Sequence, residues 1–135
     1  MRVLIDTNIL ISAALFPKST PAIAYMKAVT PPHNAVVCDY SMDELRRVYN
    51  RKFTDRIQDF ERFVSILTLS VELVSTPTKE EQKKEESAIR DVKDRPILRA
   101  AIAAKVDGIL TGDKDFLSSG ITKPKILSAS EFLSI

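Results

Sequence analysis

The stretch Val3-Leu4-Ile5-Asp6-Thr7-Asn8-Ile9-Leu10-Ile11 decides the fold of this chain, because it sets one carboxylate between two apolar runs. A first run this short and apolar is typical of a strand buried on both faces of a parallel sheet. Asn8 is a good N-cap, so we expect the strand to end near Asp6 and a helix to follow the turn. In open α/β sheets, ligands bind beyond the carboxyl ends of the strands, where Asp6 would lie. The alternative is an Asx-turn, in which Asp6 bonds only to nearby backbone.

Short apolar runs and longer helical patterns alternate along the rest of the chain. The strands that we expect cover residues 2–5, 35–38, 71–74, 108–111 and 125–127. The main helices that we expect between and after them cover residues 41–53, 55–70, 78–89, 96–105 and 129–135. This alternation predicts the α/β class, as a three-layer α/β/α sandwich around a mostly parallel sheet of about five strands. A chain of 135 residues has the length of one domain, so we expect residues 1–135 to form a single domain.

Two of the predicted helices differ in polarity. In residues 41–53 an apolar stripe faces the core, and we expect this helix to form a hairpin with residues 55–70. Residues 78–89 are polar all round and rich in opposite charges three and four positions apart, which predicts a solvated helix. The first of these helices also carries a basic cluster, which any anionic partner would meet. Its members are Arg46, Arg47, Arg51 and Lys52.

The composition excludes some classes of protein. Hydrophobic residues make up 44% and charged residues 28%, as in ordinary soluble proteins, and no apolar stretch is long enough to span a bilayer. We therefore expect no membrane insertion and, because no secretory signal is visible, a cytoplasmic location. The net charge of +2 permits a nucleic-acid partner without requiring one. The single cysteine, Cys38, is expected in a buried strand, and the single histidine, His33, in an exposed loop.

Several carboxylates fall at predicted strand ends or at predicted helix starts. They are Asp6, Asp39, Glu44, Asp91, Asp94, Asp113 and Asp115. Most also have a purely structural explanation. Ser41 and Glu44 match a capping box, with Ser41 as the N-cap of its helix. Asp94 stands where an N-cap would precede Pro96, and Asp113 is placed in a turn.

Four of these carboxylates are expected at the same edge of the sheet: Asp6, Glu44, Asp94 and Asp113. Carboxylates that share one crevice repel one another, and the usual remedies are a raised pKa or a bound divalent cation. A set made only of oxygen ligands suits Mg²⁺ or Mn²⁺, whereas zinc prefers thiol or imidazole groups. The residues therefore favour a Mg²⁺ or Mn²⁺ site at this edge.

Three segments resemble the PIN domain family, and most closely its bacterial and archaeal members that are toxin components of toxin–antitoxin pairs. The segments are VLIDTNIL at 3–10, RDVKDRPIL at 90–98 and LTGDKDFL at 110–117. The resemblance implies a compact α/β/α fold around a parallel sheet and a metal-dependent ribonuclease activity on single-stranded or structured RNA. It also implies an antitoxin partner and a homodimer.

The resemblance further implies roles for single residues. The family's four acidic positions, which bind the metal and are catalytic, match Asp6, Glu44, Asp94 and Asp113. Asp115 matches an acidic position that assists in relatives, whereas Asn8 and Thr111 match polar positions that support the metal site.

Two of these assignments have competitors nearby. Asp43 adjoins Glu44, and helical phase favours Glu44 because it lies at the edge of the buried stripe. Asp91 competes with Asp94, and Asp94 is favoured because the next helix starts directly after it, as in the family. The hypothesis is that the four acids hold one or two Mg²⁺ ions for RNA hydrolysis. Basic side chains could position RNA phosphates, although a basic helix face is more often simply solvated. They are Arg46, Arg47, Arg51, Lys52 and Lys114.

Other functions are less compatible with the sequence. A haloacid-dehalogenase-like enzyme would need a second Asp where Asn8 stands, and a response-regulator receiver would need a phosphoacceptor Asp after the third strand, where Ser75 stands. Two alternatives to a toxin remain open. One is a stand-alone RNA-processing nuclease, and the other is a non-catalytic module that binds RNA or protein.

Overall fold

A five-stranded parallel sheet forms the centre of the computed structural model, which describes residues 1–79 and 84–135. Its strands are β1 (Arg2–Ile5), β2 (Asn34–Cys38), β3 (Glu72–Val74), β4 (Gly108–Leu110) and β5 (Lys125–Leu127). The order is β3-β2-β1-β4-β5, with every neighbouring pair parallel. Because β1 is the central strand, Val3, Leu4 and Ile5 are all fully buried, as their apolar run predicts.

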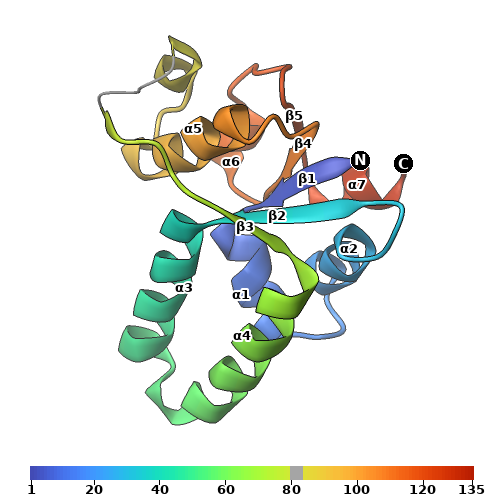
Figure 1. Cartoon of the computed structure of the whole chain (residues 1–135), viewed down its shortest axis with the longest axis vertical. Coiled ribbons are helices and arrows are strands. Elements are labelled where there is room, and N and C mark those ends of the chain that lie inside the picture. Colours follow the sequence, from blue (N-terminus) through green and yellow to red (C-terminus); the bar gives the residue numbers. More distant parts are fainter. Residues whose placement is uncertain (80–83) are drawn as a thin grey trace.

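Helices cover both faces of this sheet and complete three layers (Figure 1). One face packs against α1 (Thr7–Leu15), α2 (Thr20–Ala28), α3 (Asp39–Lys52), α4 (Ile57–Ser70) and α7 (Ala129–Leu133). The other face packs against α5 (Arg95–Ala103) and α6 (Lys114–Leu117), and the 3-10 helix η3 (Lys84–Ala88) lies against α5. Alternate residues of β1 serve the two faces, since Val3 and Ile5 lie in one hydrophobic cluster and Leu4 in the other. The predicted α/β/α sandwich is confirmed.

The predicted hairpin of two helices is present, although its second half is divided. Residues 55–70 fall into the 3-10 helix η1 (Thr54–Arg56) and α4. Tyr49 of α3 stacks on Phe60 of α4, with the ring centroids 4.6 Å apart. Tyr49 and Tyr25 are both buried in the core.

Two predicted helix starts are wrong. The N-cap of α1 is Asp6 rather than Asn8, and the backbone N–H of Thr7 donates to the Asp6 carboxylate at 2.7 Å. The capping box at Ser41 is not formed, because α3 begins at Asp39, directly where β2 ends. Ser41 is therefore buried inside the helix, with its hydroxyl 3.4 Å from the Cys38 sulfur. A complete capping box occurs instead at Ser128 and Glu131, at the start of α7.

The prediction of a solvated helix at 78–89 is wrong for the part that the structure describes; residues 80–83 lie outside it. Lys84–Ala88 form a 3-10 helix rather than an α-helix, and Glu86 is fully buried against Arg99 of α5. His33 also differs from its prediction. It is only half exposed, with its ring 5.1 Å from that of Phe132.

Among the described residues, no single helix is both long and apolar enough to cross a bilayer. The helices α1 and α2 reach that length and composition only as a pair, across a bend of 111°.

Candidate functional site

Asp6 lies at the carboxyl end of the central strand, where β1 and β4 are paired side by side. Its side chain is 2% exposed. The hydroxyl of Thr111 donates to Asp6 Oδ2 at 2.7 Å, and the Asn8 side-chain amide donates to the same oxygen at 3.3 Å. The N–H of Thr7 donates to Oδ1. The Asp6 carboxylate is therefore held both by residues that follow β1 and by Thr111, which follows β4.

Asn8 and Thr111 also fix the loop that follows β4. The Asn8 side-chain oxygen accepts from the N–H of Gly112 at 3.0 Å, and Thr111 Oγ1 accepts from the N–H of Asp113 at 3.0 Å. Asp113 is the N-cap of α6, where its Oδ1 accepts from the N–H of Asp115 at 2.8 Å. These bonds orient Asp113 relative to Asp6.

Asp91 and Asp94 lie on one short turn. The 3-10 helix η4 (Val92–Asp94) has Asp91 as its N-cap, accepting from the N–H of Lys93 at 3.0 Å. Because a 3-10 helix has three residues per turn, positions three apart lie on the same side. Carboxylate oxygens of Asp91, Asp94 and Asp113 accordingly lie within 4.8 Å of one another. In the sequence Asp91 and Asp94 compete for one acidic position, whereas the structure brings both together.

A hollow of about 190 Å³ joins these groups. It is lined by Asp6, Thr7, Asn8, Ile11, Glu44, Val48, Asp91, Lys93, Asp94 and Asp113. All four carboxylates predicted to converge therefore do so. Asp115 does not line this hollow, and its carboxylate lies 3.4 Å from the guanidinium of Arg90.

The predicted basic residues separate into two groups. Arg47 and Arg51 line a neighbouring hollow of about 210 Å³, together with Tyr40, Glu44, Val48 and Lys93. Arg46 instead lies 3.7 Å from Glu61 and over the Phe60 ring. Lys52 and Lys114 are exposed and line neither hollow. Lys93 lines both hollows, and its only signal in the sequence was its place between Asp91 and Asp94.

Burial makes the acidic hollow electrostatically unfavourable in the absence of a cation. It raises the pKa of Asp6 to about 6, with the charges of Glu44 and Asp113 adding and the bonds from Thr111 and Thr7 opposing. It also raises the pKa of Asp94 to about 9, and the carboxylates of Asp113, Asp6 and Asp91 contribute to the same shift.

The residues of this hollow fit a divalent cation of the magnesium type. Thr7 Oγ1 and Asp94 Oδ2 are both buried without a hydrogen-bond partner among the described residues, and both residues line the hollow. Unpartnered buried oxygens are costly unless a ligand satisfies them. No histidine or cysteine lines the hollow, so its side-chain donors are oxygens and one lysine amine.

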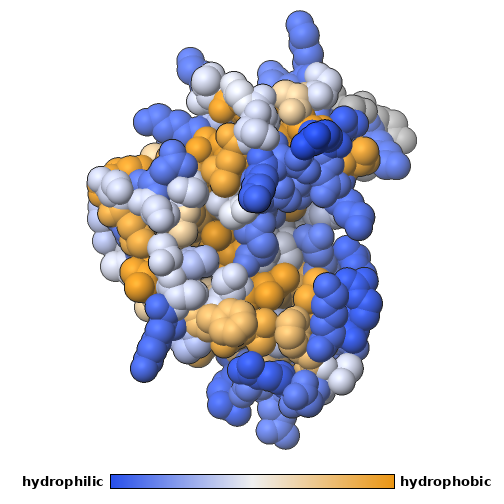
Figure 2. All heavy atoms as spheres, turned by 180° about the vertical axis from the view of Figure 1, so that it is seen from behind, coloured by the Kyte–Doolittle hydropathy of each residue, from blue (hydrophilic) through white to orange (hydrophobic). Residues whose placement is uncertain are grey.

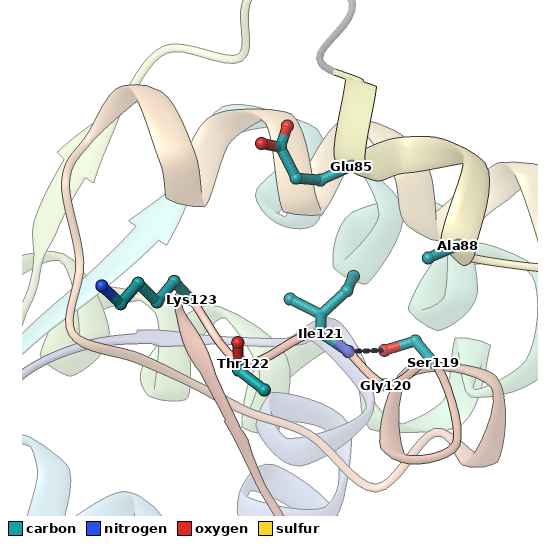
Figure 3. Close-up of a pocket in the computed structure, with 7 residues that line it drawn as sticks. All are labelled: Glu85, Ala88, Ser119, Gly120, Ile121, Thr122 and Lys123. Carbon is teal, nitrogen blue, oxygen red and sulfur yellow. Dashed lines mark hydrogen bonds between the residues drawn. The ribbon is translucent and has the colours of Figure 1, made fainter.

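Another hollow differs from the acidic one in the charge of its lining residues (Figure 3). It is lined by Glu85, Ala88 and residues 119–123, and the Ile121 side chain points into it. Among the residues that the structure describes, its charged groups are Glu85 and Lys123, which have opposite signs. The described lining therefore shows no accumulation of like charge such as distinguishes the hollow around Asp6.

Comparison with known proteins agrees with this geometry. A family model described as a PIN domain matches residues 2–115. The fold is similar to a chain in the crystal structure of VapBC2 from Rickettsia felis bound to a DNA fragment from their promoter, with a TM-score of 0.71 and 13% identity. The similarity covers 95% of this chain and 98% of that one, and at this identity it shows the fold alone. Among proteins with curated descriptions, none matches.

Proposed function

The chain belongs to the PIN domain family, whose members are nucleases that use divalent metal ions, and from this premise we propose that it is a Mg²⁺- or Mn²⁺-dependent endoribonuclease. The observation that carries the proposal is the convergence of Asp6, Glu44, Asp94 and Asp113 on one hollow, beside an unpartnered Asp94 oxygen. Carboxylates arranged in this way match the needs of phosphodiester hydrolysis.

The cation would be held by the four predicted carboxylates, which are those of Asp6, Glu44, Asp94 and Asp113. Asp91 would add a fifth, which was not predicted from the sequence. A bound divalent cation supplies an activated water and neutralises charge on the phosphate.

The remaining residues position these acids. Thr111 and Asn8 both donate to Asp6 Oδ2 and so fix the carboxylate against rotation. Asp115, whose carboxylate pairs with Arg90, contributes its backbone N–H, which orients Asp113. Lys93 places a positive charge in the hollow, where it can attract the substrate phosphate.

The biological part of the proposal is a toxin of a toxin–antitoxin pair, acting on RNA in the cytoplasm as a single domain of residues 1–135. The similarity in fold to a chain of the VapBC2 complex supports it. An antitoxin protein and a second copy of the chain are the proposed partners. Apolar side chains exposed on α4 and β3 are compatible with protein contacts, and they are Ile66, Leu69 and Leu73.

The direct test is Asp6→Asn, assayed for cleavage of single-stranded RNA with Mg²⁺ or Mn²⁺. We expect cleavage to be abolished and the fold to be retained, because the change removes a buried charge without altering shape. The matched control is Asp43→Asn, which removes the same charge from an exposed position beside Glu44. Full metal-dependent cleavage by Asp6→Asn would disprove the assigned role.

Two further measurements separate the alternatives. Wild-type protein that binds RNA but neither cleaves it nor binds Mg²⁺ or Mn²⁺ would be a non-catalytic module. Growth arrest on expression of the wild type, absent for Asp6→Asn, would support the toxin role, whereas cleavage without growth arrest would favour a stand-alone RNA-processing nuclease.

A further inference from the structure

The hollow next to the acidic site is distinguished by its positive charge. It is lined by Tyr40, Glu44, Arg47, Val48, Arg51 and Lys93, and we call it the basic hollow. It shares Glu44, Val48 and Lys93 with the acidic hollow, so the two adjoin. A molecule that enters one can therefore extend directly into the other.

The spacing of residues along α3 creates this change of charge. Glu44, Arg47 and Arg51 are three and four positions apart, which places them on one face of the helix. Glu44 belongs to the acidic end of that face, whereas Arg47 and Arg51 belong to the basic end. The surface over α3 is hydrophilic along its length (Figure 2). Lys93 approaches the same hollow from the turn η4.

The cations of the basic hollow also differ from most other arginines of the molecule. Arg46, Arg56, Arg62 and Arg90 each have a carboxylate within 4 Å. In the described part of the chain, Arg47, Arg51 and Lys93 take part in no ion pair within that distance. Three positive groups around one hollow, with Glu44 as the one carboxylate among its described lining residues, form a site that an anion would stabilise.

We propose that the basic hollow binds the phosphate of the nucleotide next to the scissile bond in single-stranded RNA, a role that rests on the proposed nuclease function. Arg47, Arg51 and Lys93 hold the phosphate, and Tyr40 offers a half-exposed aromatic ring to the adjoining base. A single strand fits because its unstacked base can reach the ring, whereas bases in a duplex are stacked and paired. The acidic and basic hollows together thus set the direction in which the strand crosses α3.

The test compares two double variants that remove the same number of positive charges. Arg47→Ala with Arg51→Ala empties the basic hollow of its α3 cations. Arg56→Ala with Arg62→Ala is the control, because it removes two positive charges from η1 and α4, outside both hollows. Both are measured for kcat and KM on a short single-stranded RNA with Mg²⁺, and for binding of the same RNA in EDTA over a range of salt concentrations.

For Arg47→Ala with Arg51→Ala we expect KM and the dissociation constant to rise about tenfold or more, with kcat changed much less. The slope of log affinity against log salt should fall by about 0.7 for each lost phosphate contact. The control variant should stay within about twofold of wild type. Substitution of both arginines by lysine should restore most of the affinity, because lysine also binds phosphate.

The outcomes distinguish this inference from the proposed function. If the wild type cleaves RNA and both double variants behave alike, the basic hollow has no such role and the nuclease proposal stands. If the wild type binds RNA through Arg47 and Arg51 but never cleaves it, the hollow is supported as an RNA-binding site and the nuclease proposal fails. Equal binding of a duplex with the same dependence on Arg47 and Arg51 would overturn the single-strand assignment, and absence of both binding and cleavage would overturn both proposals.

Discussion

Glu86 and Asp94 are two buried carboxylates near the same helix, α5, yet they differ in what surrounds them. Glu86 is fully buried, and both its oxygens accept from the Arg99 guanidinium, at 2.9 and 3.1 Å. Asp94 is 7% exposed, faces other carboxylates, and has one oxygen without a hydrogen-bond partner among the described residues. A buried carboxylate whose cation comes from the chain itself stabilises the fold. A buried carboxylate that has no such cation is suited to bind a cation from solution.

The largest effect expected from this contrast is the loss of stability when Arg99, the partner of Glu86, is replaced. Arg99→Ala should lower the free energy of unfolding by about 3–5 kcal/mol, because it removes the guanidinium from which both oxygens of the buried Glu86 carboxylate accept. It also removes the bond from Arg99 to the Pro77 carbonyl, at 2.8 Å. Urea denaturation measures the change.

Two further variants make that measurement specific. Arg90→Ala breaks an exposed pair with Asp115 and should cost less than about 1 kcal/mol. Glu86→Leu combined with Arg99→Met should recover much of the loss, since both charges are then gone. Equal destabilisation by Arg99→Ala and Arg90→Ala would contradict a structural role for the buried pair.

The next largest effect is the stabilisation expected when a divalent cation binds beside Asp94. Mg²⁺ at about 100 times its dissociation constant should stabilise the wild type by about 3 kcal/mol, because it binds only the folded site. Thermal unfolding at constant ionic strength measures this shift. Asp94→Asn should lose most of the shift, whereas Asp43→Asn should keep it. A shift of the same size in Asp94→Asn would place the bound cation elsewhere.

A third effect is the pH dependence of the protein without metal. The pKa of Asp6 rises from 3.8 to about 6 and that of Asp94 from 3.8 to about 9, so the folded state holds protons that the unfolded state has released. The free energy of unfolding should therefore fall as the pH rises from about 4 towards 9. Denaturation in EDTA across this range tests the sign, and a rise in stability would contradict it.

The smallest effect is the gain from removing one acid. Asp94→Asn should stabilise the metal-free protein by about 1 kcal/mol at pH 8, since an amide is neutral without the proton that folded Asp94 must bind at this pH. Asp43→Asn, at an exposed position, should change the stability by less than about 0.5 kcal/mol. Destabilisation by Asp94→Asn in EDTA would show that its carboxylate contributes to the fold after all.

Much of the fold and of the candidate site could be predicted, because both depend on patterns within short segments. The apolar run before Asp6 predicts a strand buried on both faces, and the parallel topology then brings Asp113 to the same edge. Whether these residues act as predicted remains a proposal.

The errors arose where distant residues decide the local structure. Glu86 looks solvated in the sequence, because nothing near it shows that Arg99 will lie beneath it. The start of α5 directly after Asp94 is confirmed and favours that acid, but the 3-10 turn before α5 also brings Asp91 to the same side. Ser41 is not the N-cap that the sequence predicts, because α3 starts immediately after β2.

The central place of β1 has a consequence for how the protein is made. β1 leaves the ribosome before its partner β4, and the Thr111 hydroxyl that holds Asp6 comes 105 positions after it. A nascent chain that has not yet exposed this second half has neither Asp113 nor the pairing that orients Asp6. The acidic hollow therefore cannot assemble before β4 and the loop that carries Asp113 have been synthesised, so folding of the site is later than synthesis of its first acid.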